Sequence, residues 1–162
     1  LGFTYCKNSD KWECRPSNKS KMSLYDKCRK ELIRKNCIAR LNAATFTRIN
    51  QIVKGWINYF RMGKMKSFID EFGQWLRHKI RAIILKQWKV PLKIYRSLQL
   101  LNKKLPYHFT DEQIFSVANS RLGWFRRATG NIVSFLLNAD ILAIISLLPA
   151  SLLKSTTAPP DT

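Results

Sequence analysis

The sequence predicts a mainly α-helical protein, with an N-terminal β-hairpin, a bundle of three helices and a smaller C-terminal helical lobe. Apolar residues recur at helical spacing after residue 17, whereas β-favouring residues gather in the first 16. The links between the first three helical stretches are short, which favours an antiparallel bundle. A hydrophobic content of 46% over 162 residues is sufficient for a folded core.

Residues 1–16 make up the predicted hairpin. The segment from Leu1 to Cys6 is rich in aromatic and β-favouring residues, Asn8 to Asp10 is a turn signal, and a second β-like segment ends before Pro16. An isolated hairpin is only marginally stable in water. We therefore expect this hairpin to pack on the rest of the chain or on a partner.

Residues 17–90 contain the three bundle helices. The first begins after Ser17 or Ser20 and ends near Lys35, the second runs from about Thr45 to Phe60, and the third from about Ser67 to Trp88. Gly63 follows the second helix as a stop signal. The apolar faces are formed by Leu24, Cys28 and Leu32; by Phe46, Ile49, Ile52, Val53, Trp56 and Phe60; and by Phe68, Phe72, Trp75, Leu76, Ile80, Ile83, Ile84 and Trp88.

Residues 91–153 are predicted to form the smaller helical lobe. A helix follows Pro91 as far as Leu101, and a capping box at residues 110–113 begins another helix at Asp111, which ends near Ser120. The apolar run at residues 131–148 predicts a last helix, ended by Pro149. Residues 132–153 include Asn138, Asp140 and Pro149, so we expect a helix docked on the core and not a membrane span. Residues 154–162 are predicted to be a disordered tail.

The charge of the chain indicates a polyanionic partner. There are 29 Lys and Arg residues against 10 Asp and Glu, giving a net charge of +19. A folded domain this basic favours nucleic acid first and an anionic membrane surface second, because cations bind phosphates and release their counterions. After residue 130 the sequence has one cation, Lys154, and two acids, Asp140 and Asp161. The partner is therefore expected to meet the first four-fifths of the chain.

The sequence contains no pattern that predicts an active site, so we expect no catalytic residue, no cofactor and no metal. The adjacent acids at residues 70–71 and 111–112 point in different directions on a helix and do not converge on a metal. His78 and His108 have no placed nucleophile or carboxylate beside them. Four cysteines lack zinc-site spacing and are expected to be reduced thiols; they are Cys6, Cys14, Cys28 and Cys37.

The N-terminal segment also lacks the layout of a signal peptide. We therefore expect an intracellular protein, in the bacterial cytoplasm or inside an organelle, and not a secreted one. The chain opens on Leu1 and not on Met, which favours a piece of a longer polypeptide.

Five tryptophans are interleaved with Arg and Lys. Exposed aromatic rings can stack on unpaired bases, as in many single-stranded RNA sites. Trp56, Trp75 and Trp88, however, lie on the apolar faces of their helices, so we expect them to build the bundle while Trp12 and Trp124 remain open to either role. The interleaved cations then become the expected working surface.

Several motifs in order resemble the maturase-specific domain of group II intron-encoded proteins, also called domain X or the thumb. They are Gly55-Trp56-Ile57-Asn58-Tyr59-Phe60-Arg61, the pattern of Phe68, Asp70, Trp75, Arg77 and Arg81, the segment Lys86-Gln87-Trp88-Lys89, and the blocks Ala118-Asn119-Ser120-Arg121 and Gly123-Trp124-Phe125-Arg126. In addition, Leu1-Gly2-Phe3-Thr4 resembles the hairpin that closes a reverse-transcriptase palm. The resemblance covers roughly residues 1–127.

The resemblance implies a thumb-like bundle that binds and stabilises group II intron RNA and so assists splicing, without catalysis of its own. In the family this domain follows a reverse transcriptase and grips the template–primer duplex. The sequence has no Tyr-Ala-Asp-Asp motif to supply metal-binding aspartates. The alternative is therefore a thumb fragment of an RNA-directed DNA polymerase whose palm and fingers, missing from this chain, would contact it. A membrane-surface protein is the weakest alternative, and no membrane partner is expected.

Matching to the family pattern also predicts individual residues. The matched positions are Gly55, Trp56, Asn58, Tyr59, Arg61, Trp75, Arg77, Arg81, Gln87, Trp88, Arg121 and Trp124. Some of them are expected to build the bundle without touching RNA. The residues predicted to face RNA are Arg61, Arg77, Lys79, Arg81, Lys86, Lys89, Arg121 and Arg126.

Overall fold

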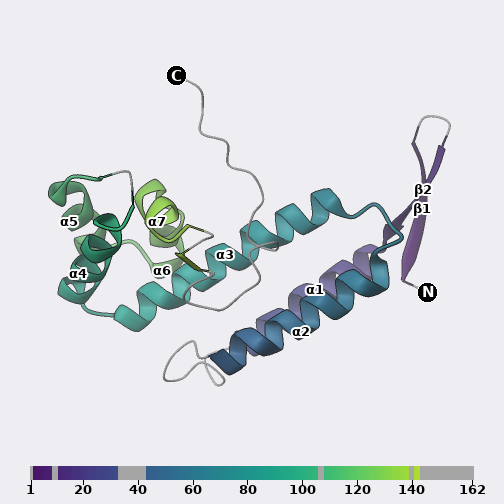
Figure 1. Ribbon diagram of the computed structural model, residues 1–162, viewed down its shortest axis with the longest axis horizontal. Coiled ribbons are helices and arrows are strands. Elements are labelled where there is room, and N and C mark those ends of the chain that lie inside the picture. Colours follow the sequence, from purple (N-terminus) through teal and green to yellow (C-terminus); the bar gives the residue numbers. More distant parts are fainter. Residues whose placement is uncertain (1, 9–10, 33–42, 106–107, 139–140, 143–162) are drawn as a thin grey trace.

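The computed structural model describes residues 2–8, 11–32, 43–105, 108–138 and 141–142 (Figure 1). It confirms a mainly helical fold that begins with a two-stranded antiparallel hairpin. Three long helices follow, and four shorter ones gather at the far end of the third (Figure 1). The third helix therefore joins the two helical parts of the molecule.

The hairpin consists of β1 (Phe3–Asn8) and β2 (Lys11–Pro16), with Phe3 opposite Pro16. It packs on the bundle, as expected: the Phe3 ring lies 4.9 Å from the Phe60 ring and 5.9 Å from the Tyr59 ring. The start of the hairpin is tied to the start of α1, because the Ser17 amide donates to the Gly2 carbonyl at 2.8 Å. Gly2 has a φ of +80°, where a side chain would be strained. These contacts hold the hairpin on the end of the second helix.

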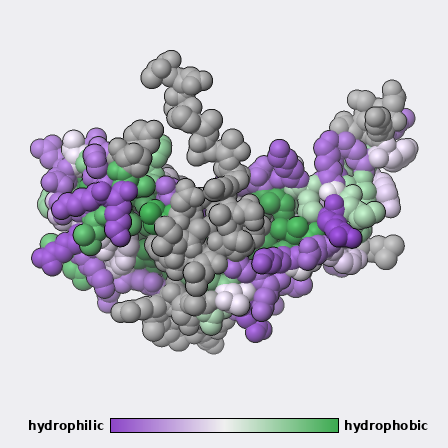
Figure 2. All heavy atoms as spheres, viewed as in Figure 1, coloured by the Kyte–Doolittle hydropathy of each residue, from purple (hydrophilic) through white to green (hydrophobic). Residues whose placement is uncertain are grey.

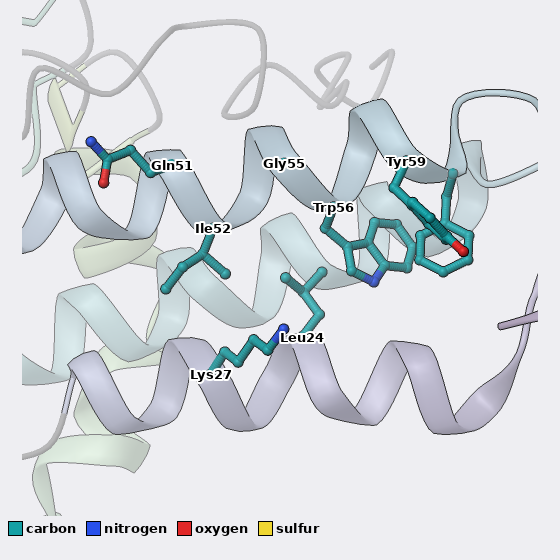
Figure 3. A pocket seen from close by; sticks show the side chains of 8 residues that line it. Leu24, Lys27, Gln51, Ile52, Gly55, Trp56 and Tyr59 are labelled. Carbon is teal, nitrogen blue, oxygen red and sulfur yellow. The ribbon is translucent and has the colours of Figure 1, made fainter. Parts of the chain in front are cut away.

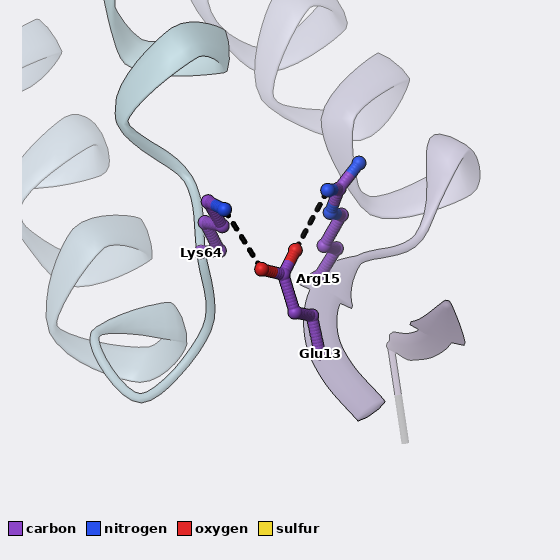
Figure 4. A network of polar contacts seen from close by, with 3 residues as sticks. All are labelled: Glu13, Arg15 and Lys64. Atoms are coloured by element: carbon purple, nitrogen blue, oxygen red, sulfur yellow. Dashed lines mark hydrogen bonds and ion pairs between the residues drawn. The ribbon is translucent and has the colours of Figure 1, made fainter. Parts of the chain in front are cut away.

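A charged contact ties the hairpin to the link after the second helix (Figure 4). The Glu13 carboxylate accepts hydrogen bonds from Lys64 Nζ and from Arg15 Nη2, both at 2.7 Å. These two bonds, with that of Lys64 the larger, lower the pKa of Glu13 to about 2. The Lys64 amide also donates to the Cys14 carbonyl at 2.8 Å, so both the backbone and the side chain of Lys64 hold β2 against the link after α2.

The bundle contains α1 (Asn18–Glu31), α2 (Ala43–Phe60) and α3 (Lys66–Trp88), which alternate in direction (Figure 1). Ser17 caps α1 by accepting from the Ser20 amide at 3.3 Å. The first helix ends at Glu31, earlier than the predicted Lys35, which lies outside the described residues. The starts of α2 and α3 each lie within two residues of the predicted positions, as frayed helix ends allow.

The bundle core is aromatic as well as aliphatic. Tyr25 of α1 contacts three rings of α3, with centroid distances of 5.9 Å to Phe68, 5.2 Å to Phe72 and 4.8 Å to Trp75. Its fully buried members include Leu24, Phe46, Ile49, Ile80 and Leu85. Burial raises the pKa of the Cys28 thiol to about 12, so this cysteine is a packing residue that stays protonated at neutral pH.

The C-terminal lobe consists of α4 (Pro91–Asn102), α5 (Asp111–Asn119), α6 (Trp124–Ala128) and α7 (Asn131–Leu136). The predicted capping box is present: the Gln113 amide donates to Thr110 Oγ1, and the Thr110 amide donates to Gln113 Oε1. Pro91 occupies the first turn of α4. The short helix α6 was not predicted, because five residues carry too little periodicity.

The prediction of one helix over residues 131–148 is wrong. Helix α7 ends at Leu136, and Leu137 leaves helical geometry with φ −106° and ψ 55°. The Asn138 side chain then accepts from the Ile141 amide at 2.9 Å, which begins a new helical turn. Among the residues that the structure describes, no helix is long and apolar enough to cross a membrane. The predicted tail, residues 154–162, lies outside them.

Truncating Phe72 tests the aromatic core. We expect Phe72→Ala to lower the free energy of unfolding by about 3–5 kcal/mol, because it removes a ring that contacts Tyr25, Phe68 and Trp75. Urea denaturation followed by circular dichroism measures this loss. The control Gln74→Ala, at an exposed position of α3, should change the value by less than about 0.5 kcal/mol. Similar values for both variants would contradict the proposed core.

The Glu13 contact predicts a pH dependence of stability. Because its folded pKa lies near 2, below the ordinary 4.5, the carboxylate stabilises the fold fully above pH 4.5 and loses this effect as the pH falls toward 2. The stability difference between wild type and Glu13→Gln should therefore shrink over that range. Urea denaturation at pH 6, 4 and 2.5 measures it, and a difference that does not change with pH would rule the contact out.

Candidate nucleic-acid interface

A groove between α1, α3 and α6 gathers cations around an aromatic floor, and we call it the α1–α3–α6 groove. It has a volume of about 660 Å³. Its lining residues are Arg29, Leu32, Trp75, Lys79, Ala82, Ile83, Lys86, Gly123, Trp124 and Phe125. Three of these are cations and none is an acid. A groove with this lining attracts anions and offers rings on which a flat group can lie.

Two of the cations lie over aromatic rings. The Arg29 guanidinium is 5.6 Å from the centroid of the Trp75 ring, and Lys79 Nζ is 5.2 Å from that of Phe125. Such cation–π contacts contribute about 0.5–1 kcal/mol each at partly exposed sites. They restrict the side chains before any ligand arrives, so less conformational entropy is lost when a phosphate binds.

Helical spacing places the groove residues. Trp75, Lys79, Ala82, Ile83 and Lys86 follow one another at intervals of four, three, one and three, and so share one face of α3. The opposite wall comes from α6, which packs on α3 immediately after the turn at residues 120–123. The chain thus brings residue 29 beside residue 75, and residue 79 beside residue 125.

His78 attaches α6 to α3. Its Nε2 atom lies 3.0 Å from the Phe125 carbonyl, to which it donates as N–H, and its ring centroid is 4.0 Å from that of Phe125. Burial is the main cause that lowers the pKa of His78; the Phe125 bond opposes it, and Arg81 and Lys79 lower the pKa further. The imidazole is therefore mainly neutral at neutral pH and positions Phe125 without adding a charge.

Arg81 and Arg77 point into the fold, whereas the sequence predicted that both face RNA. Arg81 Nε donates to the Leu137 carbonyl at 2.9 Å, and its other nitrogens donate to the hydroxyl and carbonyl of Ser134. Burial lowers its pKa to about 10, so it keeps its charge at neutral pH. Arg77 is 8% exposed, and burial lowers its pKa although Asp70 opposes the shift. The contacts of Arg81 fasten α7 to α3.

The other six predicted residues are at least partly accessible. Lys79 and Lys86 line the groove. Arg126 follows Phe125 on α6, and Arg121 precedes that helix. Arg61 lies just beyond α2, and Lys89 just beyond α3 with a φ of 56°. The structure therefore gathers Lys79 and Lys86 with the α6 segment, while Arg61 and Lys89 stand at helix ends. RNA contact by all six remains a prediction.

Sequence reasoning missed Arg29. Arg29 was not among the residues predicted to face RNA, yet it completes the groove from α1. One signal was present: Tyr25 and Arg29 are four residues apart, and the guanidinium lies 5.9 Å from the Tyr25 ring centroid. The pairing of Arg29 with Trp75 depends on how α1 and α3 pack, which one helix alone cannot show.

The tryptophans on the apolar faces are scaffold residues, as predicted. Trp56 Nε1 donates to the Ser20 carbonyl at 3.3 Å and so joins α2 to α1. Trp75 meets Tyr25 edge-on, and Trp88 packs against the buried core. Trp124 also packs on the core, with the Arg127 guanidinium 5.0 Å from its ring centroid. Trp12 differs, being 71% exposed on the hairpin.

Asp111 and His108 make structural contacts. Asp111 accepts from Gln99 Nε2 at 3.1 Å at the start of α5, and His108 Nδ1 lies 3.2 Å from the Asn102 carbonyl. In the described ranges, no group of three or more His, Cys, Asp or Glu side chains is placed to hold a metal ion. On the face seen in Figure 2, hydrophilic side chains lie over α4–α5 and along α1–α2, with hydrophobic ones between them.

Comparison with known families matches part of the chain. Residues 21–99 match the family model described as the group II intron, maturase-specific domain. The match spans most of α1, all of α2 and α3, and most of α4, so it includes two of the three walls of the α1–α3–α6 groove. No curated protein sequence matches the chain.

The packing role of Arg81 can be tested against an exposed arginine. We expect Arg81→Met to lower the free energy of unfolding by about 2–4 kcal/mol, because carbonyls of Leu137 and Ser134 lose a charged donor. The matched control Arg126→Met, at an exposed position of α6, should change it by less than about 0.5 kcal/mol. Chemical denaturation of both variants decides, and equal stability would contradict the assigned role.

Proposed function

We propose that the chain binds structured group II intron RNA and assists splicing by stabilising the folded RNA, because residues 21–99 match the family model of the group II intron, maturase-specific domain. The role is non-covalent, and the reacting groups of splicing belong to the RNA. The observation that carries the proposal is the α1–α3–α6 groove, where three cations and three aromatic side chains meet without an acid.

The chemistry of the groove suits an RNA backbone. Lys79 and Lys86 lie two helical turns apart on α3, with Arg29 facing them from α1. Spaced cations can contact successive phosphates, whereas a compact anion would need them to converge on one point. Trp75, Trp124 and Phe125 add surface for a sugar or an unstacked base. Arg121 and Arg126 extend the positive potential along the α6 wall.

Binding of this kind is sufficient to assist folding of the RNA. A protein that binds only the folded RNA stabilises it by an amount that grows with free protein concentration, about 2.7 kcal/mol at 100 times the Kd. No catalytic side chain is required for that effect. Site preference would come from the arrangement of phosphates in the folded intron, because phosphate contacts fix position without reading base sequence.

We further propose that the hairpin contacts a reverse-transcriptase palm when the domain is part of a longer polypeptide. Tyr5 and Trp12 are 69% and 71% exposed. The strand register places their side chains on the same face of the hairpin, because Tyr5 is opposite Cys14 and Lys7 is opposite Trp12. Two exposed aromatic rings on one face favour burial against another domain. The reading frame upstream of residue 1 tests the idea: an in-frame Tyr-Ala-Asp-Asp segment supports it, and a stop codon opposes it.

The salt dependence of RNA affinity tests the proposed function. For a folded group II intron RNA, log Kd should rise steeply with log salt between 50 and 200 mM KCl, because each phosphate contact releases a counterion. The double variant Lys79→Ala/Lys86→Ala should lower that slope by about 1–2. Fluorescence anisotropy with labelled RNA measures both quantities.

The matched control is Lys103→Ala, which removes an exposed lysine beyond α4, outside the α1–α3–α6 groove. It should leave the slope nearly unchanged. If log Kd of the wild-type chain did not change with salt, the proposed function would be wrong. Equal slopes for all variants would place the RNA contact outside the α1–α3–α6 groove.

A further inference from the structure

Gly55 occupies a position where this chain has no need of glycine. It lies inside α2, five residues before the end of the helix, and is exposed. Its φ is not positive, and an added Cβ would meet no atom of the described residues within 4 Å. Glycine in a helix interior is less stable than alanine, because it loses more backbone entropy on folding. Neither packing nor backbone geometry accounts for it.

Because Gly55 has no side chain, it leaves open space beside α2. It lies in a groove between α1 and α2, which we call the α1–α2 groove (Figure 3). The lining residues are Leu24, Lys27, Gln51, Ile52, Gly55, Trp56, Tyr59 and Phe60. Lys27 reaches from α1 toward α2, and Trp56 extends from α2 toward α1 (Figure 3). A bare stretch of helix backbone therefore lines a hollow between side chains.

The groove continues as a basic surface. An adjoining hollow shares Lys27, Gln51 and Ile52 with it and adds Lys30, Glu31 and Arg48. Glu31 is the single acid among these described lining residues, and it accepts from Arg48 Nε at 3.2 Å. The two hollows together thus carry more positive than negative charge. On α2, residues 48, 51, 55 and 59 follow at intervals of three, four and four, so they form one continuous stripe.

We propose that the α1–α2 groove is a second RNA contact, in which the sugar–phosphate backbone passes against α2 at Gly55. The proposal rests on the proposed function and names a separate part of the surface. Glycine is favoured where another backbone must approach closely, and among the described residues no backbone approaches Gly55 in this way. Lys27 and Lys30 contact the phosphates on the α1 side. The ring of Tyr59, 59% exposed, borders the path on the α2 side.

The two grooves lie on opposite sides of α1. Lys27 and Lys30 line the side toward α2, whereas Arg29 and Leu32 line the side toward α3. The first helix thus supplies cations to both. A folded RNA with two neighbouring segments is a better match for this arrangement than a single short strand, because each groove can receive one segment.

Substitutions that add a side chain at Gly55 test the proposal on the full chain. Gly55→Ala and Gly55→Gln should leave the Tm unchanged or raise it, because both side chains favour helix and meet no neighbour. The affinity for a folded group II intron RNA should nevertheless fall, by about 3-fold for alanine and about 10-fold or more for glutamine, as a displaced backbone loses phosphate contacts. Thermal denaturation and fluorescence anisotropy give the two readouts.

Two further variants make the result specific. Gln74→Ala, at an exposed position of α3 outside both grooves, should change neither Tm nor affinity. Lys27→Ala should lower the slope of log Kd against log salt by about 1. A lower Tm for Gly55→Ala would show that the glycine serves the fold, and would overturn the proposal.

The outcomes separate the two proposals. Wild-type affinity with a steep salt response, together with unaltered affinity for both Gly55 variants, would overturn the second contact and leave the proposed function in place. A wild-type chain that does not bind the RNA would overturn the proposed function, and the second contact with it. Opposite changes in stability and affinity, with a larger loss for glutamine than for alanine, would support the second contact.

Discussion

The packing of Tyr25 between α1 and α3 is the interaction on which the rest of the structure depends. Three rings of α3 meet one ring of α1, mostly edge-on, within 4.8–5.9 Å. Large rings hold two helix backbones further apart than small aliphatic residues do. The outer edges of the helices then form grooves instead of a flush surface. The α1–α3–α6 groove begins where this cluster ends, at Trp75, whose ring also lies against the Arg29 guanidinium.

The excess of positive charge is divided between two roles. Some cations serve the fold: Arg81 donates to the carbonyls of Ser134 and Leu137 at the C-terminal end of α7, and Lys64 holds the hairpin through Glu13. Others line the two grooves. The α1–α3–α6 groove has no acid among its lining residues, and the hollow that adjoins the α1–α2 groove has Glu31, which is paired with Arg48. Like charges repel in the compact state, so an uncompensated basic surface lowers stability in the absence of a polyanion. The aromatic core offsets that cost, and binding of RNA would remove part of it.

Much of the fold followed from local pattern. The hairpin, the three long helices and the capping box at residues 110–113 depend on neighbours within a few residues, so their signals are present in any short window. The errors arose where tertiary contacts override local pattern. The apolar run after residue 131 reads as one helix, but the chain leaves helical geometry at Leu137, whose carbonyl binds Arg81, and starts a new turn at Asn138. The five-residue α6 depends on its contact with α3.

The sequence by itself determined the class of the fold, the resemblance to a group II intron maturase-specific domain and the scaffold positions of Trp56, Trp75 and Trp88, and it predicts an anionic partner. Periodicity, charge and ordered motifs are properties of the chain in one dimension, and folding does not alter them. Only the tertiary structure decided which cations are accessible. Arg77 is buried, the half-buried Arg81 donates to the Leu137 carbonyl, Arg29 is brought to Trp75, and Gly55 has no described residue packed against it. The physical reason is that a helix surface acquires an inside and an outside only when other helices pack against it.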